Sequence, residues 1–350
     1  MPLGAALDLL SVYPSMSAIS LADVYRARRR LMGRVALTPL VESARLSELA
    51  GTRVYLKLET VQPTGSFKIR GATNALAQLA ERGVTRVVTA STGNHGRAVA
   101  HAAHALGLEA TVCLSSRVPQ NKVQAVRALG AKVCLAGNSQ DDAEREAARL
   151  AAQEGLAYVP PFDDLDVIAG QATIGLEIVE ALPAVAQVVV PLSGGGLFSG
   201  VAFAARQCCP DVKLTGITMR SGAAMHASLA AGKPVCVDEI ATLADSLGGG
   251  IGLANRYTFS MTRSLIDDAL LVDEEAIARA IVHAYRHERL ILEGAAAVGI
   301  AAVLGGAVSA STQARRGPIV LIASGANIDM DLHRRLLLEA PDVEPEHVFS

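Results

Sequence analysis

Tryptophan is absent from the 350-residue sequence, and aromatic residues make up only 3% of it. Hydrophobic residues nevertheless reach 51%, so the core must be built from Ala, Val, Leu and Ile. Such a composition suits buried parallel strands covered by Ala-rich helices. A chain of this length is expected to form about two domains.

The sequence also lacks an excess of either charge, because 32 basic residues face 34 acidic ones. This balance gives no reason to expect nucleic acid or a membrane surface as a partner. No apolar run is long enough to cross a bilayer, and no basic segment precedes the apolar start. We therefore expect no signal peptide and a cytoplasmic protein.

Cysteine is scarce, with five residues, and no C-x-x-C pair is present. An odd number of cysteines without metal-ligand spacing favours buried, reduced thiols over disulfides or a metal site.

Short β-branched runs alternate with Ala-rich segments, which is typical of βαβ units and parallel sheets. Ser66 is expected to cap a helix that ends near Gly83, and Asn138 and Ser139 precede the acidic first turn of one that runs to Gly155. A Pro- and Asp-rich stretch near 160–166 separates two such series, which predicts two α/β domains with a cleft between them. The expected strands are 53–58, 86–89, 109–114, 132–135, 188–191, 213–218 and 319–323.

Lys68 lies in the word S-F-K-I-R-G-A, at the start of the first of these helices. The positive end of the helix dipole disfavours a cation there. A lysine whose ammonium is destabilised is more easily neutral and nucleophilic, so it can hold a Schiff base. Taken alone, this segment also fits a solvated surface lysine.

A second polar segment, S-T-G-N-H-G, follows the strand 86–89 and opens a helix. Backbone N–H groups converge at such a turn and bind a carboxylate or phosphate, although an ordinary capped loop has the same pattern. The residues concerned are Ser91, Thr92, Gly93, Asn94, His95 and Gly96.

A third segment, S-G-G-G-L, follows the strand 188–191, and consecutive glycines let backbone amides approach a phosphate. A dinucleotide fold needs an acidic residue after the next strand, and that residue is missing, so a monophosphate is favoured over a dinucleotide. A tight turn with close helix packing remains the alternative. A fourth segment, S-G-A-N, follows the strand 319–323 and should point Ser324 into the cleft.

The order of these four segments resembles that of the fold-type II pyridoxal-phosphate enzymes, which are two-domain α/β proteins like the tryptophan synthase β subunit. Within that group the sequence is similar to the threonine/serine dehydratase and serine racemase branch. The words T-P-L, I-A-G-Q and L-E-G-A also match, and the similarity spans about residues 19–331. The resemblance implies a large domain of 1–70 and 157–330, a small domain of 71–156 and a tail of 331–350, each domain a mostly parallel sheet flanked by helices.

The resemblance also implies site residues, with pyridoxal 5′-phosphate as the cofactor. Lys68 would carry the cofactor and remove the substrate α-proton, and Phe67 would pack on the ring. Asn94 would contact the ring hydroxyl, Ser324 the ring nitrogen, and Glu293 would lie near the ring. The phosphate would rest on Ser193, Gly194, Gly195, Gly196 and Leu197, and the substrate would lie among Ser91, Thr92, Gly93 and His95. Thr92 stands where racemases have a serine acid, which disfavours racemisation.

The implied activity is removal of water and ammonia from a β-hydroxy amino acid by a homodimer. An amino-acid racemase, a 3-hydroxyaspartate dehydratase and a β-replacement synthase remain alternatives. Thr218 stands where cation-dependent relatives have a glutamate, so no metal is predicted. Arg97 is expected to be solvated or to read a second acidic group on the substrate. The words S-T-G-N-H-G-R-A and A-D-S-L-G-G-G-I-G-L look similar to hydroxyectoine-utilisation dehydratases, which implies a ring-opened β-hydroxy diamino acid as the substrate.

Overall fold

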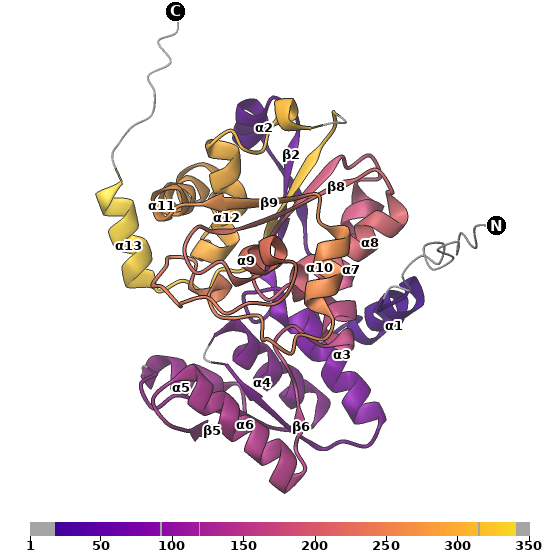
Figure 1. Ribbon diagram of the computed structural model, residues 1–350, viewed down its shortest axis with the longest axis vertical. Coiled ribbons are helices and arrows are strands. Elements are labelled where there is room, and N and C mark those ends of the chain that lie inside the picture. The colour runs from indigo at the N-terminus through magenta and orange to yellow at the C-terminus, as the bar shows by residue number, and fades with distance from the viewer. Residues whose placement is uncertain (1–17, 92, 119, 314–315, 341–350) are drawn as a thin grey trace, which may run out of the picture.

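Two sheets form the framework of the computed structural model, which describes residues 18–340 apart from 92, 119 and 314–315. The larger sheet has the order β1-β2-β10-β7-β8-β9 and the smaller one β5-β4-β3-β6, and Figure 1 shows the smaller sheet below the larger. The larger sheet comprises β1 (Leu40–Ser43), β2 (Val54–Leu58), β10 (Ile319–Ala323), β7 (Gln187–Pro191), β8 (Lys213–Met219) and β9 (Asp268–Val272). The smaller comprises β5 (Lys132–Leu135), β4 (Glu109–Leu114), β3 (Arg86–Ala90) and β6 (Ala157–Tyr158).

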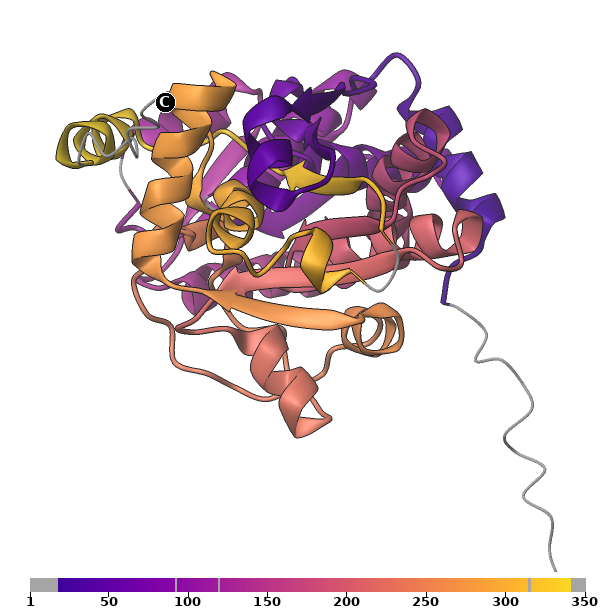
Figure 2. The same cartoon turned by 90° about the horizontal axis from the view of Figure 1, so that it is seen from above.

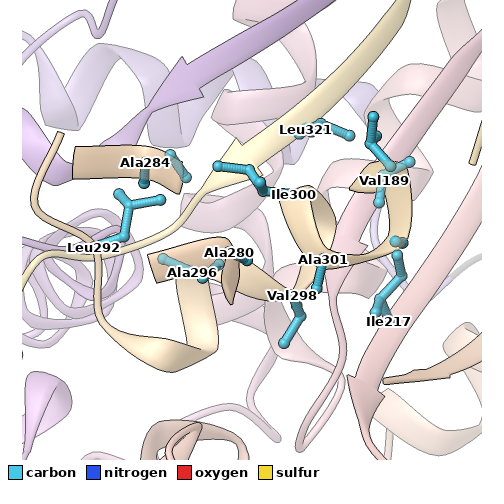
Figure 3. Close-up of a cluster of buried hydrophobic side chains, with 14 of the residues drawn as sticks. Val189, Ile217, Ala280, Ala284, Leu292, Ala296, Val298, Ile300, Ala301 and Leu321 are labelled. Atoms are coloured by element: carbon cyan, nitrogen blue, oxygen red, sulfur yellow. The ribbon is translucent and has the colours of Figure 1, made fainter. Parts of the chain in front are cut away.

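All strand pairs are parallel except β1 with β2, which are antiparallel. Every residue of the central strands β7 and β10 is buried, as expected for strands covered on both faces. Figure 3 shows Ile300 of α12 (Gly294–Leu304) near Leu321 of β10 and Val189 of β7, within one cluster of buried aliphatic side chains. Small and branched aliphatic residues therefore fill the core, as the composition predicts.

Helices flank both sheets, and Figure 2 shows α1 and α13 at opposite sides of the molecule. Around the larger sheet lie α1 (Leu21–Leu31), α2 (Ala44–Ala50), α7 (Leu165–Ala181), α8 (Gly196–Cys208), α9 (Ala224–Ala231), α10 (Thr258–Leu265), α11 (Glu274–His283), α12 and α13 (Met330–Glu339). The smaller sheet is flanked by α3 (Lys68–Glu81), α4 (Asn94–Leu106), α5 (Gln120–Ala128) and α6 (Gln140–Glu154). Short 3-10 turns are η1 (Glu59–Val61), η2 (Asp245–Leu247) and η4 (Ala310–Thr312), and a π-helical turn covers Ala284–Glu288.

The helix α3 joins the two domains because it packs closely on α7. A Cβ atom at Gly170 of α7 would lie 2.6 Å from the carbonyl oxygen of Arg70 on α3, so only glycine permits this approach. The start of α3 is thereby fixed against the larger domain. Lys68, its first residue, lies where the two domains meet.

The seven expected strands are present with ends shifted by at most one residue, whereas β1, β6 and β9 were not predicted. The strand β9 carries an aspartate and is only half-buried, and β6 has two residues, so neither has the long apolar run of a central strand. The helix expected after Asn138 and Ser139 is α6: Ser139 is its N-cap, and Gly155 ends it with a φ of +70°.

Three expectations were wrong. Ser66 does not cap α3: the N-cap is Phe67, and its backbone N–H donates to the carbonyl of Ser324 instead. The expected tail at 331–350 begins as the helix α13, because Asp329 caps its first turn, and 341–350 lie outside the described residues. The cysteines are not all buried, since only Cys113 is buried and Cys208 and Cys236 are exposed. Among the described residues, no helix has the length and apolarity needed to cross a membrane.

Candidate active site

A cleft of about 1150 Å³ lies between the two domains, at the carboxyl ends of β3, β7 and β10. This edge of a parallel sheet is where α/β proteins bind their ligands. The cleft is lined by every described residue predicted for the site: Phe67, Lys68, Ser91, Gly93, Asn94, His95, Ser193, Gly194, Gly195, Gly196, Leu197, Glu293 and Ser324. Thr92 lies outside the described residues.

The amine of Lys68 faces this cleft from the first turn of α3. Its Nζ donates to the carbonyl oxygen of Pro161 at 2.8 Å and lies 5.4 Å from the centroid of the Phe67 ring. Burial lowers the pKa of Lys68 from 10.5 to about 8, and the charge of Glu293 opposes this decrease. The neutral, nucleophilic form of the amine is therefore far more populated near neutral pH than in an ordinary lysine.

The glycine turn forms an open cup at the start of α8. Gly195 is the N-cap of this helix, with a φ of +88° and no side-chain cap, so the first N–H groups of α8 remain free of side-chain partners. Cβ atoms at Gly194 and Gly196 would lie 2.5 and 2.9 Å from atoms of Phe162, which closes one side of the cup. Backbone amides without side-chain partners at the positive end of a helix suit a phosphate group.

Asn94 and Glu293 are joined directly across the cleft. The Nδ2 of Asn94 donates to both carboxylate oxygens of Glu293, at 2.8 and 3.1 Å. Burial raises the pKa of Glu293 to about 7, while the hydrogen bond from Asn94 opposes that rise. Glu293 can therefore change its charge near neutral pH, a few ångströms from the helix turn that presents Asn94.

His95 is buried in the same turn and is neutral. Burial, together with the charge of Lys68, lowers its pKa to about 3. Its Nε2 lies 3.0 Å from the carbonyl oxygen of Val159, and a neutral ring donates its single N–H to that carbonyl. The ring is thus held in one orientation and one tautomer, with Nδ1 left as an acceptor.

Two residues that the sequence did not assign to the site hold Asn94 in place. Asn327 donates through Nδ2 to the Oδ1 of Asn94 at 2.6 Å, and Arg97 donates through Nη1 to the Oδ1 of Asn327 at 2.9 Å. Arg97 is half-buried and its Nη1 binds Asn327, so it is not the freely solvated helix residue that was one of the two expectations. In the sequence, two features could have pointed to these residues: Asn327 ends the segment S-G-A-N, and Arg97 follows Asn94 by one helical turn.

The outer wall of the cleft was also missed. It is formed by the segment 235–253 and the start of α6, and it carries Cys236, Glu239, Asp245, Ser246, Gln140, Asp141 and Glu144. Asp245 and Ser246 lie in the segment A-D-S-L-G-G-G-I-G-L, which the sequence comparison singled out without assigning it to the site. The other residues lie in loops or first turns without a distinctive spacing.

The site residues fit a phosphorylated aromatic aldehyde such as pyridoxal phosphate. Lys68 supplies an amine of lowered pKa, and the side-chain-free cup supplies amides for a phosphate. Ser324 is buried at the end of β10 and lines the cleft with a hydroxyl group. The amine, the amides and a neutral hydroxyl are the groups that such a molecule needs around it.

Comparison with known proteins agrees with this fit. Residues 31–325 match the family model described as "Pyridoxal-phosphate dependent enzyme". A Sinorhizobium fredii protein named "Putative threonine dehydratase" is 56% identical, and the match covers 92% of this chain and 96% of that protein. An "L-threonine ammonia-lyase" of Thermotoga maritima is 42% identical, with coverage of 91% and 78%.

Solved structures show the same fold. Maize serine racemase superposes with a TM-score of 0.85 at 31% identity, covering 92% of this chain and 97% of that one. The processed threonine deaminase isoform 2 of Solanum lycopersicum gives 0.82 at 35% identity, covering 91% and 89%. The chain belongs to the family of pyridoxal-phosphate dependent enzymes.

Proposed function

We propose that this protein is a lyase that removes water and ammonia from threonine or a related β-hydroxy amino acid. The observation that carries the proposal is the buried amine of Lys68, which faces the same cleft as an uncapped glycine turn. The names of the relatives at 56% and 42% identity support the reaction class. The proposal also includes the cytoplasmic homodimer and the domain boundaries that the sequence resemblance implies.

Lys68 would hold the cofactor and exchange a proton with the substrate. The chemistry supplied by bound pyridoxal phosphate is an aldehyde that joins amines and a conjugated ring that accepts electrons. With a pKa of about 8, the Nζ of Lys68 can accept the proton from the substrate Cα while the substrate is bound. The contact with the Pro161 carbonyl keeps this nitrogen at the cleft wall.

The polar turns would orient the remaining groups. Amides of the cup at 194–197 would hold the phosphate, and Ser91 and the turn at Gly93 would receive the substrate carboxylate at the start of α4. Ser324 offers a hydroxyl where an aspartate would keep a ring nitrogen protonated. A neutral ring withdraws electrons more weakly, so departure of the β-hydroxyl competes well with slower side reactions.

The hydroxyectoine assignment stays a prediction about the substrate. The relatives named above concern threonine, and their names carry no information about a diamino acid. Racemisation also remains open to test, because the residue at the racemase acid position, Thr92, lies outside the described part of the chain.

The test is a substrate panel scored for ammonia and 2-oxo acid. Threonine, serine, 3-hydroxyaspartate and a β-hydroxy diamino acid are compared, with loss of optical activity followed in parallel. We expect stoichiometric ammonia and 2-oxo acid from at least one substrate, and no turnover by Lys68→Ala. Racemisation without ammonia release, or full turnover by Lys68→Ala, would refute the proposal.

A further inference from the structure

A chain of hydrogen bonds runs from Arg97 through Asn327 and Asn94 to Glu293. The Nη1 of Arg97 donates to Oδ1 of Asn327 at 2.9 Å, and Nδ2 of Asn327 donates to Oδ1 of Asn94 at 2.6 Å. The Nδ2 of Asn94 then donates to both oxygens of Glu293. The Nδ2 of Asn327 also donates to the carbonyl oxygen of Thr64 at 2.9 Å.

This chain has a fixed direction because a guanidinium group only donates hydrogen bonds. Arg97 therefore selects the oxygen end of the Asn327 amide, and the carbonyl oxygen of Thr64, which can only accept, selects its NH₂ end. Both contacts favour the orientation in which this NH₂ group faces Asn94. The oxygen of Asn94 must accept that bond, so the NH₂ group of Asn94 faces Glu293. A donor-only group at one end thus presents a donor to the carboxylate at the other.

This chain of hydrogen bonds also connects the two domains. Arg97 and Asn94 lie one turn apart on α4 of the small domain, whereas Asn327 and Glu293 belong to the large domain beside the end of β10. Asn94 and Glu293 are at least nine-tenths buried, where a hydrogen bond of the wrong polarity is costly. Arg97 itself is only half-buried and is not among the residues that line the cleft.

We propose that Arg97 is a positioning residue: together with the carbonyl of Thr64 it orients the Asn327 amide, and through it directs the NH₂ group of Asn94 at the carboxylate of Glu293. This inference deepens the proposed function, since it concerns the same site, and rests on it for its effect on turnover. A glutamate or other acceptor at position 97 would favour the opposite direction for these hydrogen bonds, with the oxygen of Asn94 directed at the carboxylate.

The charges around Glu293 do not replace the effect of the Asn94 hydrogen bond on its ionisation. Lys68 on α3 favours the ionised carboxylate, whereas Asp245 of η2 opposes it, and the backbone N–H of Asn327 donates to it. Burial remains the largest influence and favours the protonated acid. The hydrogen bond from Asn94 is thus the main contribution that a change at position 97 can remove.

The experiment titrates Glu293 in the cofactor-free protein by infrared difference spectroscopy, with the Glu293 band identified by its loss in Glu293→Gln. Arg97→Met removes the donor, Arg97→Lys keeps donors only, and Arg97→Glu reverses the polarity. We expect the pKa of Glu293 to rise by about one unit in Arg97→Met, the size expected for one hydrogen bond to a charged group. Arg97→Glu should raise it further, and Arg97→Lys should leave it near the wild-type value.

Turnover provides a second readout. The acid limb of the kcat/KM profile of the holoenzyme should move in the same order as the infrared titration. Arg149→Met is the matched control, because Arg149 is an exposed arginine on α6 whose partners are Glu146 and Glu154. It should change neither readout.

An unchanged Glu293 titration in Arg97→Met or Arg97→Glu would overturn the inference, and so would an Arg97→Lys variant as altered as Arg97→Met. If Arg97→Met fails to fold, the comparison of Arg97→Lys with Arg97→Glu decides the same question. A wild-type protein that releases no 2-oxo acid would refute the proposed function but not the role of Arg97, because the infrared titration needs no turnover.

Discussion

A methyl group on Gly195 would lie 2.8 Å from the Cε of Met225 and 2.9 Å from the Oγ1 of Thr262. The backbone of Gly195 has a φ of +88°, which side chains other than glycine rarely adopt. Space and backbone conformation therefore both require glycine at the N-cap of α8. This requirement keeps the cup open toward the cleft.

Gly195→Ala should impair cofactor binding more than it impairs folding. The left-handed backbone costs about 1–2 kcal/mol for alanine, and displacement of the cup should weaken pyridoxal phosphate binding at least about tenfold. The matched control is Gly83→Ala, since Gly83 has a φ of +82° with no atom within 4 Å of its Cβ position. Absorbance titration and urea unfolding of both variants separate the effects; equal cofactor affinities would contradict the role of the cup.

Glu293→Gln should change how the stability of the cofactor-free protein depends on pH. Folding raises the pKa of Glu293 from 4.5 to about 7, so the folded protein binds more protons between these values and wild-type stability falls as pH rises across them. The shift corresponds to a fall on the order of 3 kcal/mol. Glutamine cannot ionise, so the variant should lack this part of the fall in the free energy of unfolding measured in urea.

The control for that measurement is Glu275→Gln, because Glu275 is an exposed residue paired with Arg279 on α11. It should retain the wild-type pH dependence. A Glu293→Gln variant with an unchanged slope between pH 4.5 and pH 7 would show that Glu293 keeps its ordinary pKa.

Arg70→Met should destabilise the protein strongly, although Arg70 does not line the cleft. Its guanidinium contacts both oxygens of Glu59 at 2.8 Å, and its Nη1 lies 2.5 Å from Oε1 of Glu177. Removing one partner of a buried ion pair costs about 3–5 kcal/mol, because the remaining carboxylate is left buried and unpaired.

The pH dependence of Arg70→Met identifies the cause. Burial raises the pKa of Glu59, but Arg70, with smaller contributions from Thr38 and Lys57, outweighs it and holds that pKa below 4.5, so in the wild type this stabilisation is lost as pH falls through the lowered pKa. In the variant the buried acid takes up a proton more readily, so the difference from wild type should shrink at acid pH. Lys132→Met breaks only the exposed pair with Glu109 and should change stability little. A constant difference at all pH values would argue for lost packing instead.

The sequence predicted the parallel core and the polar turns because both depend on local signals. The strand β10 is an uninterrupted apolar run, and the turns at Ser193 and Ser91 have glycines where a strand meets a helix. The edge strands were not predicted, because they become strands by pairing with a neighbouring strand and not through their composition. The segment 40–43 becomes β1 only through its register with β2.

The polar contacts inside the site could not be predicted for a different reason. Asn94 and Glu293 are 199 residues apart, and Arg97 and Asn327 are 230 apart, so only the packing of the start of α4 against the residue before α12 and the segment after β10 brings each pair together. The same packing explains why Ser66 does not cap α3. Its segment is held by backbone bonds to the end of β10, through Phe67 and the bridge between Ser66 and Gly325.

The most direct test of the account is reduction of the purified protein, loaded with pyridoxal phosphate, by borohydride, followed by peptide mass analysis. We predict one pyridoxyl-modified peptide, with the adduct on Lys68, and none in Lys68→Ala. A modified lysine elsewhere, such as Lys122 in the same cleft, or no reducible adduct at all, would contradict it.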